Sequence, residues 1–469
     1  MKLQIMGANR SLRRAIVCGF VGLLAFGISV QSWGEPSEKK VRRISSLEEL
    51  ETYSKKSGNI VRMTPGVYRL IDHIPLERIA ERRAAKQFQF LDFTGSDNQF
   101  LLEGVTLEVD TRLREALRAP IHNPEFRISG NHNWVSGLTL TNIGDGTSPA
   151  GNVLTIAGDG VTLEKCTIHV RGSYPYGYGD FFGKGGKPLI GHRKHSGVQI
   201  LGNNSRILGC ALFLRSFGHG FYIQGGSKHY FEDCVVEGEM RKTESMLAET
   251  SGPAFRLDFQ AEMTNREGTR RILPGYMKSL AEDGYRTYAG IQEVHLVRCT
   301  ARNMRGGFEL RTKNGGVRLE DCTATGNERG FWLGGGALAE RCKGDAEFGP
   351  LLFLDGDRIS VDLEVMPTSS DRVVHALATI HGDGHDVSLR PWKKLERASP
   401  LPIFVGFSQP AAGEGAAPYR VQKARGVKLR NETRMPVSVS DQAADCQIVS
   451  RGAVTENAGQ RIRVESLPE

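Results

Sequence analysis

Six cysteines recur in one local frame through the middle of the chain. Each closes a short segment in which apolar and other residues alternate, and the six segments are 161–166, 205–210, 229–234, 294–299, 317–322 and 337–342. Successive cysteines lie 44, 24, 65, 23 and 20 residues apart, so three gaps share one short period and two fit multiples of it with insertions. A repeat of about twenty residues built on short alternating segments is typical of a solenoid.

A second set of short strands precedes these segments. They are Val198–Ile200, Phe221–Ile223, Phe255–Leu257, Phe308–Leu310 and Phe331–Leu333. Their alternation predicts one buried face, and glycine or asparagine fills the joints between strands. No helix of ten residues fits between consecutive strands here, so the strands must stack coil upon coil. The pattern predicts an all-β fold, a single-stranded right-handed parallel β-helix.

The first 34 residues have the features of a signal peptide. Lys2, Arg10, Arg13 and Arg14 precede the apolar stretch from Ala15 to Val30, which is short for a membrane span. We expect a secreted or periplasmic protein that has no membrane association after cleavage; the alternative is an uncleaved anchor. These four cations contribute half of the formal net charge of +8.

The remaining composition excludes several classes of partner. No basic tail or aromatic-interleaved basic patch predicts nucleic-acid binding. Seven cysteines remain after the signal peptide, an odd number, and we expect them to be buried thiols, one per coil. No Cys-x-x-Cys pair and no clear calcium loop is present, so we expect no metal and no cofactor. We expect a monomer.

Residues 35–87 are predicted to be a linker and an N-terminal cap with the first strands, and residues 88–469 the β-helix. The linker covers 35–44, a helix follows Ser45, a strand covers Asn59–Met63, and Pro75–Lys86 is a second helical stretch. This opening resembles that of secreted pectate-lyase-like β-helix proteins, in which a short helix closes the first coil. Three insertions interrupt the period, at 171–194, 239–252 and 260–288. Such insertions often form a binding face.

Aligning the strands at the residue before each one predicts two outward columns. The first contains Gln199, Tyr222, Arg256, Glu309 and Trp332, and the second contains Leu201, Gln224, Asp258, Arg311 and Gly334. Aromatic faces and arginines in a row suit a glycan that carries carboxylates. The alternative is a ladder of solvated side chains with incidental ion pairs.

Histidines lie close to these columns. His219 stands between two glycines directly before the strand Phe221–Ile223, and histidine exchanges protons near neutral pH. His195 ends a basic run that closes the first insertion, and Arg241 lies in a similar run in the second. The alternatives are a corner histidine that satisfies backbone groups, and solvated loops.

Two resemblances bear on function. The layout resembles secreted polysaccharide lyases of the pectate-lyase-like superfamily, which implies an anionic polysaccharide as substrate. Gly218-His219-Gly220 and Arg311-Thr-Lys313 resemble the Gly-His-Gly and Arg-x-Lys motifs of the polygalacturonase family, which implies that His219 supports catalysis and that Arg311 and Lys313 bind a carboxylate. That family's Asn-Thr-Asp and Asp-Asp motifs are absent upstream, where Ser196-Gly-Val-Gln199 stands.

We therefore hypothesise a lyase, or an epimerase, that removes the C5 proton of a uronate polymer. Arg256 and Arg311 would hold the carboxylate, His219 would be the base, and His195 or Tyr222 the acid. The substrate-binding candidates are Gln199, Gln224, Asp258, Glu309, Lys313, Arg241 and Trp332. The alternatives are a glycoside hydrolase that uses Asp258 and Glu309, and a non-catalytic glycan-binding β-helix.

Overall fold

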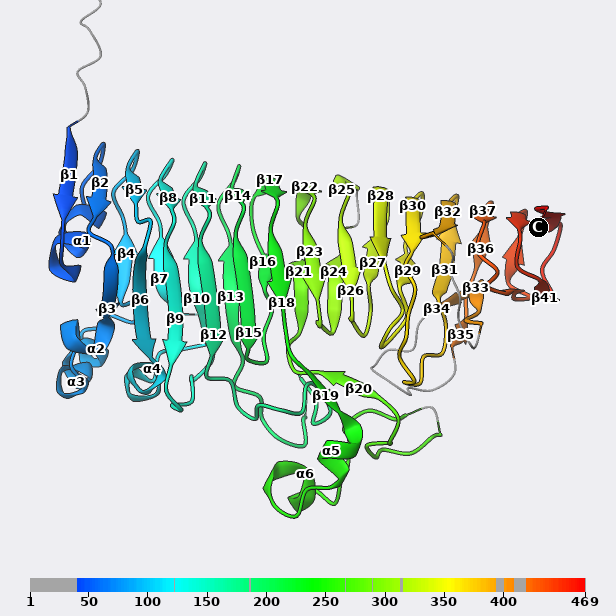
Figure 1. Cartoon of the computed structure of the whole chain (residues 1–469), viewed down its shortest axis with the longest axis horizontal. Coiled ribbons are helices and arrows are strands. Elements are labelled where there is room, and N and C mark those ends of the chain that lie inside the picture. Colours follow the sequence, from blue (N-terminus) through cyan, green and yellow to red (C-terminus); the bar gives the residue numbers. More distant parts are fainter. Residues whose placement is uncertain are drawn as a thin grey trace, which may run out of the picture. The chain divides into compact units, whose positions relative to one another are not determined.

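Short parallel strands stack along the chain in a computed structural model (Figure 1). The structure describes residues 40–121, 123–184, 187–265, 267–288, 290–312, 315–393, 400–408 and 419–468. The proposed signal peptide at 1–34 and the candidate Lys313 lie outside these ranges. Residues 40–469 belong to one compact unit, whose long ladders are all parallel. The predicted parallel β-helix, the architecture of the pectate-lyase-like proteins, is confirmed.

The first sheet contains two side-by-side ladders that β28 joins. One ladder is β1 (Val41–Ile44), β2 (Ile60–Met63), β5 (Gln99–Leu101), β8 (Trp134–Ser136), β11 (Thr162–Glu164), β14 (Arg206–Leu208), β17 (Ser227–Glu232), β22 (Gln292–Val297), β25 (Val317–Glu320), β28 (Leu338–Gly344), β30 (Ser360–Val365), β32 (Asp386–Pro391), β37 (Lys428–Asn431), β40 (Gln447–Ser450) and β42 (Arg463–Ser466). The other is β3 (Gly66–Arg69), β6 (Val105–Asp110), β9 (Thr139–Ile143), β12 (Thr167–Arg171), β15 (Ala211–Arg215), β18 (Val235–Glu237), β23 (Thr300–Arg302) and β26 (Thr323–Thr325).

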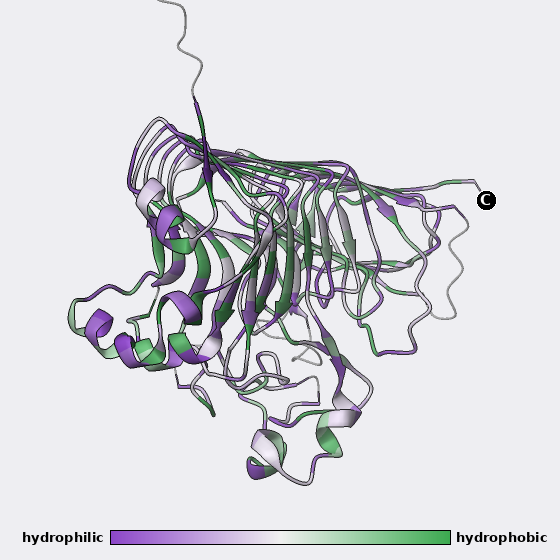
Figure 2. Cartoon of the chain, turned by 60° about the vertical axis from the view of Figure 1, so that its left-hand side comes forward, coloured by the Kyte–Doolittle hydropathy of each residue, from purple (hydrophilic) through white to green (hydrophobic). Residues whose placement is uncertain are grey.

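The second sheet faces the first across the core. Its main path is β4 (Leu91–Phe93), β7 (Pro124–Ile128), β10 (Gly151–Ile156), β13 (His195–Ile200), β16 (Phe221–Ile223), β21 (Asp283–Thr287), β24 (Gly306–Leu310), β27 (Phe331–Gly334), β29 (Leu352–Asp355), β31 (Ala378–Asp383), β33 (Ile403–Val405), β38 (Val437–Val439) and β41 (Val454–Asn457). Smaller pairings add β34 (Phe407–Ser408) with β35 (Arg420–Val421), and β36 (Ala424–Arg425) with β39 (Ala443–Ala444). Hydrophobic segments run through the stacked strands (Figure 2), and one continuous core cluster extends from Ile44 to Ile448.

Five of the six recurring cysteines lie at a bend between the two ladders of the first sheet, and the sixth, Cys342, lies inside β28, which joins the ladders. The residue before each of the seven cysteines has a positive φ, from 50° to 59°. This left-handed residue reverses the chain, and the next side chain then points into the core. All seven thiols are free and buried, as expected. Several donate to a carbonyl of the preceding coil; the Cys234 thiol, for example, lies 3.3 Å from the Ile207 oxygen.

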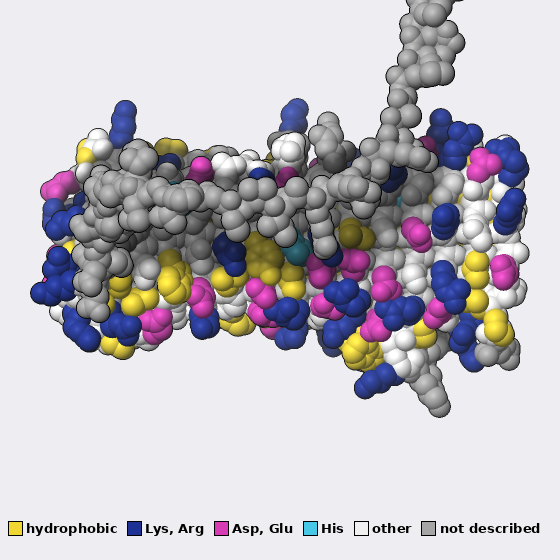
Figure 3. Space-filling model, turned by 90° about the horizontal axis from the view of Figure 1, so that it is seen from above, with side chains coloured by type: hydrophobic (Ala, Val, Ile, Leu, Met, Phe, Trp, Pro, Cys, Tyr) yellow, Lys and Arg dark blue, Asp and Glu magenta, His cyan; other side chains and the backbone are white. Residues whose placement is uncertain are grey.

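The outer side of this bend carries stacked opposite charges. Asp233 pairs with Arg298 at 2.8 Å, and Asp321 pairs with Arg341 at 3.0 Å, each pair joining neighbouring coils. Basic and acidic side chains lie close together over one face of the molecule (Figure 3). Exposed pairs contribute little stability each, but their sign order disfavours a shifted register.

The N-terminal end starts earlier than predicted. Residues Val41–Ile44 of the expected linker form β1, which pairs in parallel with β2. Helix α1 (Leu47–Ser54) follows, with Ser46 as its N-cap, and it buries Leu47 and Leu50 in the main core. The second predicted helical stretch is a 3₁₀ turn, η1 (Leu76–Arg78), continued by α3 (Ile79–Ala84). The remaining helices of this end are α2 (Leu70–His73) and α4 (Thr111–Leu117).

One predicted strand is wrong. Phe255–Leu257 does not form a strand but lies in and after helix α6 (Gly252–Arg256), which has proline at its start. The second and third predicted insertions are therefore one excursion, which ends before β21 and not at residue 288 as predicted. It also contains β19 (Met240–Lys242), β20 (Met277–Ser279) and α5 (Thr243–Leu247) and projects beside the middle coils (Figure 1). It shares a separate hydrophobic cluster with the first insertion, formed by Tyr178, Phe182, Met246, Ala254, Ala261, Ile272 and Leu280.

Candidate functional site

The outer face of the second sheet forms the floor of the candidate site. Register pairs Gln199 with Tyr222, and Tyr222 with Arg286. The same column continues through Glu309 to Trp332. The predicted column is thus confirmed at four of five positions, and Arg286 occupies the place expected for Arg256.

The structure contradicts the predicted placement of Arg256 and Asp258. Both lie in the large insertion, because the helix Gly252–Arg256 leaves them outside the coil. Asp258 is exposed and pairs with Arg271 at 3.0 Å, and Arg256 is also exposed. The register places Arg286 and Tyr288 where these two residues were expected.

His219 sits at the centre of a cluster of polar side chains beside this column. Its Nδ1 lies 3.2 Å from Oδ2 of Asp283, and its Nε2 lies 3.0 Å from the Tyr288 hydroxyl. The carboxylate of Glu282 is 3.4 Å from the same Nε2. Only 7% of His219 is exposed, so the Tyr288 hydroxyl is its route towards the groove. The predicted corner histidine is therefore part of a chain of proton-exchanging groups.

The buried Arg305 and the half-buried Lys194 neutralise the two carboxylates. Arg305 contacts Asp283 at 2.9 Å and Glu282 at 3.5 Å, and Lys194 contacts Glu282 at 2.7 Å. Burial opposes ionisation, but the charges of His219, Lys194 and Arg305 outweigh it and lower the pKa of Glu282 to about 2. Burial acts in the same way on Asp283, and Arg305 and His219 hold its pKa well below the ordinary value. Both carboxylates are thus anions that face the two ring nitrogens of His219.

The insertions hold this network in place. Asp180, from the first insertion, binds Lys278 of β20 at 2.5 Å and Arg305 at 3.3 Å. Lys278 also contacts Glu328 at 3.1 Å. Asp180 therefore joins the first insertion to the large excursion, through Lys278, and to Arg305, which directly precedes β24.

Two arginines of the column are fixed by one carboxylate. Glu309 is 2% exposed and forms ion pairs with Arg286 and, at 2.6 Å, with Arg311. The Arg311 guanidinium lies 4.0 Å from the centre of the Trp332 ring, and that of Arg329 lies 5.2 Å from it. Trp332 therefore holds arginines, and it does not offer the open ring face that was expected for sugar stacking.

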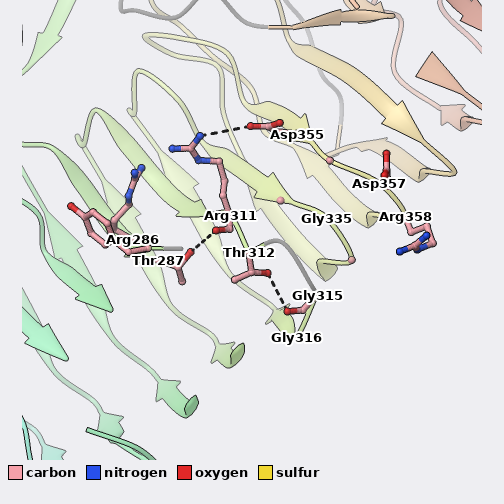
Figure 4. A pocket seen from close by; sticks show the side chains of 14 residues that line it. Arg286, Thr287, Arg311, Thr312, Gly315, Gly316, Gly335, Asp355, Asp357 and Arg358 are labelled. Carbon is pink, nitrogen blue, oxygen red and sulfur yellow. Dashed lines mark hydrogen bonds and ion pairs between the residues drawn. The ribbon is translucent and has the colours of Figure 1, made fainter. Parts of the chain in front are cut away.

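A groove of about 1030 Å³ opens over the ends of these strands. Arg286, Arg311 and Arg358 contribute its positive charges, and Asp355 and Asp357 its negative ones (Figure 4). Six glycines line the remaining wall, from Gly315 to Gly356. Because glycine has only a hydrogen as its side chain, these positions leave backbone amides accessible and leave room for a bulky ligand. Tyr288 also lines the groove, so the phenol bonded to His219 reaches it.

The other predicted residues lie elsewhere or behind the groove. His195 is fully buried and faces Glu125 at 3.3 Å, so it cannot donate a proton in the groove. Burial and the charge of Arg114 lower its pKa to about 3. Arg241 binds the Gly177 carbonyl and Glu249 within the insertions. The expected contact of Arg241 with substrate stays a prediction.

Gln199 and Tyr222 lie in the first expected column, on β13 and β16, and Gln224 directly follows β16. The amide of Gln199 donates to Gln224 at 2.5 Å and accepts from Thr155 at 2.9 Å. Tyr222 is 5% exposed, and its ring centre is 5.6 Å from that of His219. Burial raises its pKa, so the phenol stays protonated.

The sequence interpretation missed Asp283, Arg286, Tyr288 and Arg305. One signal was available: Gly284-Tyr285-Arg286 has the same Gly-aromatic-x form as Gly220-Phe221-Tyr222 and Gly307-Phe308-Glu309. That form would have aligned the correct strand.

No helix among the described residues is long and apolar enough to cross a membrane. Within the same ranges, no group of three or more His, Cys, Asp or Glu side chains is arranged to hold a metal ion.

No protein-family model and no curated protein matches the sequence. Solved structures of low similarity do. An alginate lyase of family PL6 in complex with a trisaccharide is 10% identical, with a TM-score of 0.43, and the match covers 92% of this chain and 86% of that one. The A-module of an Azotobacter vinelandii mannuronan C-5 epimerase is 10% identical, with a TM-score of 0.41 and coverage of 88% and 91%. An endo-xylogalacturonan hydrolase from Aspergillus tubingensis is 9% identical, with a TM-score of 0.33 and coverage of 91% and 93%.

Proposed function

We propose that this chain is an enzyme that removes the C5 proton of a uronate residue in an anionic polysaccharide. The observation that supports this most is the chain Tyr288–His219–Asp283, which ends beside Arg286 and Arg311 in the groove. A carboxylate binder next to a proton-transfer group is what abstraction of a proton α to a carboxylate requires.

Arg311 and Arg286 would bind the sugar carboxylate and withdraw charge from it. Both arginines pair with Glu309, which fixes their orientation, and part of each guanidinium group faces the groove. Arg311 has a side-chain exposure of 34% and Arg286 of 17%. Their charge stabilises the dianionic intermediate that forms when C5 loses its proton.

Tyr288 would move the proton. Burial and the nearby Glu282 carboxylate raise its pKa, so the resting phenol is protonated. It would pass that proton to Nε2 of His219, whose Nδ1 faces the Asp283 carboxylate, and its oxygen would then accept the C5 proton. In an elimination the C4–O4 bond breaks, its electrons leave with O4, and a C4=C5 double bond forms. The leaving oxygen takes up a proton from solvent, to which His219 releases the proton that it accepted. In an epimerisation the C4–O4 bond stays intact, and a proton from solvent is delivered to the opposite face of C5.

Hydrolysis with the carboxylates proposed from the sequence has less support. Asp258 lies outside the sheet, and Glu309 is bound by two arginines, so neither is arranged as a protonated acid that faces the groove. The test separates the reactions. Elimination on polygalacturonate or alginate produces ultraviolet absorbance, hydrolysis produces reducing ends without it, and epimerisation produces solvent exchange at C5 alone.

Tyr288→Phe is expected to lower kcat at least about 100-fold with a much smaller change in KM, because it removes proton transfer and leaves the arginines in place. Tyr230→Phe is the matched control, since that hydroxyl binds Glu232 on β17 of the other sheet. Equal activity of Tyr288→Phe and the wild type would exclude the assigned role. Binding without turnover on all uronate polymers would instead favour a glycan-binding protein.

A further inference from the structure

A second hollow lies between the N-terminal helices and the first insertion. It has a volume of about 870 Å³ and is lined by α3, α4, the loop before β10 and Arg193. Four arginines and one glutamate surround it: Arg83, Arg112, Arg118, Arg193 and Glu115. Neither the sequence interpretation nor the groove chemistry uses this site.

The charges of this hollow are poorly compensated. Arg112 is paired with Asp110 at 2.5 Å, but no carboxylate among the described residues pairs with Arg83, Arg118 or Arg193. The Arg83 guanidinium donates to the Ala116 carbonyl at 3.4 Å, whereas the bonds between Arg193 and Tyr174 are made by the backbone of both residues. These three guanidinium groups are exposed. This differs from the groove, where Glu309 and Asp355 bind the arginines.

Unpaired arginines around a concave surface suit planar anions. A guanidinium offers two parallel N–H donors to a carboxylate, and several around one hollow can engage successive charges of a polymer. Apolar side chains of Leu76, Ala116 and Pro149 complete the lining and offer contact for the faces of sugar rings.

The hollow is connected to the candidate active site through one short segment. Arg193 lines the hollow, and the next residue, Lys194, binds Glu282 beside His219. The start of β13 lies two strand spacings from the start of β21, which is about 10 Å along the sheet. A polymer that occupies the groove has a second anion-binding surface within a few sugar lengths.

We propose that this hollow, formed by Arg83, Arg118 and Arg193, is a second, non-catalytic binding site for carboxylated polysaccharide. The identity of the ligand rests on the proposed function, whereas the site itself rests on the arginines and their lack of carboxylate partners. Long polymers would use the site and short oligosaccharides would not, because only a long chain reaches beyond the groove.

The test measures binding without turnover. Arg118→Glu/Arg193→Glu is introduced into the Tyr288→Phe protein, and polygalacturonate, alginate and dextran sulfate are titrated by calorimetry at low and physiological salt. Both residues are exposed, so the fold should tolerate the changes. Arg434→Glu/Arg451→Glu is the control, with the same change in charge at two exposed arginines near the C-terminus.

The Arg118→Glu/Arg193→Glu variant, the pocket variant, is expected to bind a carboxylated polymer at least about tenfold more weakly, whereas the affinity of the control changes by less than about twofold. Binding of a uronate trisaccharide should stay the same. Equal losses in both variants, no loss in either, or a loss only for dextran sulfate would overturn the proposal. If the polymer is never turned over but the pocket variant still binds it more weakly, the second site stands and the proposed reaction fails.

Discussion

His195 and Glu125 form a buried pair. We expect variants that lack one or the other to change their stability with pH in opposite directions. Burial raises the pKa of Glu125 to about 7, although Arg114 opposes the shift. Burial and Arg114 lower the pKa of His195 to about 3. Between pH 4.5 and 6.5 the folded protein holds one proton on Glu125, and the unfolded chain holds one on His195. The folded and unfolded states therefore bind the same number of protons, and the opposite contributions of the two groups to the pH dependence of stability cancel in the wild type.

Each single variant exposes one of these effects. In Glu125→Gln, His195 remains, and its proton binds only to the unfolded chain, so stability should fall by about 2 kcal/mol as the pH decreases from 6.5 to 5. In His195→Gln, Glu125 remains, and stability should fall by about 2 kcal/mol as the pH increases from 5 to 6.5. Urea unfolding at both pH values, relative to wild type, measures the slopes. Slopes of the same sign in the two variants would contradict the assignment.

At the same scale, the sequence predicted the column but not all of its members. Gln199, Tyr222, Glu309 and Trp332 were placed correctly because the side-chain period of a strand is two and each strand follows a recognisable corner. Side-chain contacts across the sheet were not predictable. The ion pairs of Glu309 and the stacking of Arg311 on Trp332 depend on the register of separate coils.

At the level of the strand, a column of glycines explains why coils of unrelated sequence share one register. Gly197, Gly220, Gly284, Gly307 and Gly330 follow one another in neighbouring strands of the second sheet. A Cβ on Gly307 would lie 2.7 Å from the Gly330 oxygen, and one on Gly284 would lie 2.8 Å from the Gly307 oxygen. These contacts are too short for any side chain, so glycine is required by the close approach of the coils.

Gly307→Ala is therefore expected to destabilise the fold by about 1–3 kcal/mol, because strand and neighbour must move apart. Gly191→Ala is the control, since a Cβ there would meet no atom within 4 Å. Chemical denaturation with fluorescence detection measures both. A Gly307→Ala protein as stable as the control would show that the backbone relaxes without cost.

The same glycines show why one element was mispredicted. Ala254 precedes Phe255–Leu257, whereas Gly284 precedes the strand that belongs in the column. The alternation of Phe255–Leu257 fits a strand over three residues, but Gly252 and Pro253 start a helix there. Three residues are too few to distinguish the two periods. This error hid part of the candidate site, because Tyr288 directly follows β21, the strand that takes the place predicted for Phe255–Leu257.

At the scale of the whole stack, the buried thiols report how its coils unfold. Burial raises the pKa of Cys234 and Cys299, so little of the reactive thiolate forms while the coils are closed. Each coil contacts only its neighbours, and a terminal coil therefore loses less on opening than a central one. On the ladder of β40, only β42 follows, and the residues of β42 are exposed.

Pulsed alkylation in low urea should therefore modify Cys446 before Cys234 and Cys299, although all three thiols are buried. The reason is that opening the last coils breaks one inter-coil interface, whereas opening the middle breaks two and also releases the insertions. Mass spectrometry of the cysteine peptides gives the order of labelling. The unlabelled protein should melt at the same temperature with and without reductant, since the described cysteines form no disulfide. Simultaneous labelling of all three would mean that the stack unfolds as one cooperative unit, and that nearest-neighbour contacts do not limit its opening.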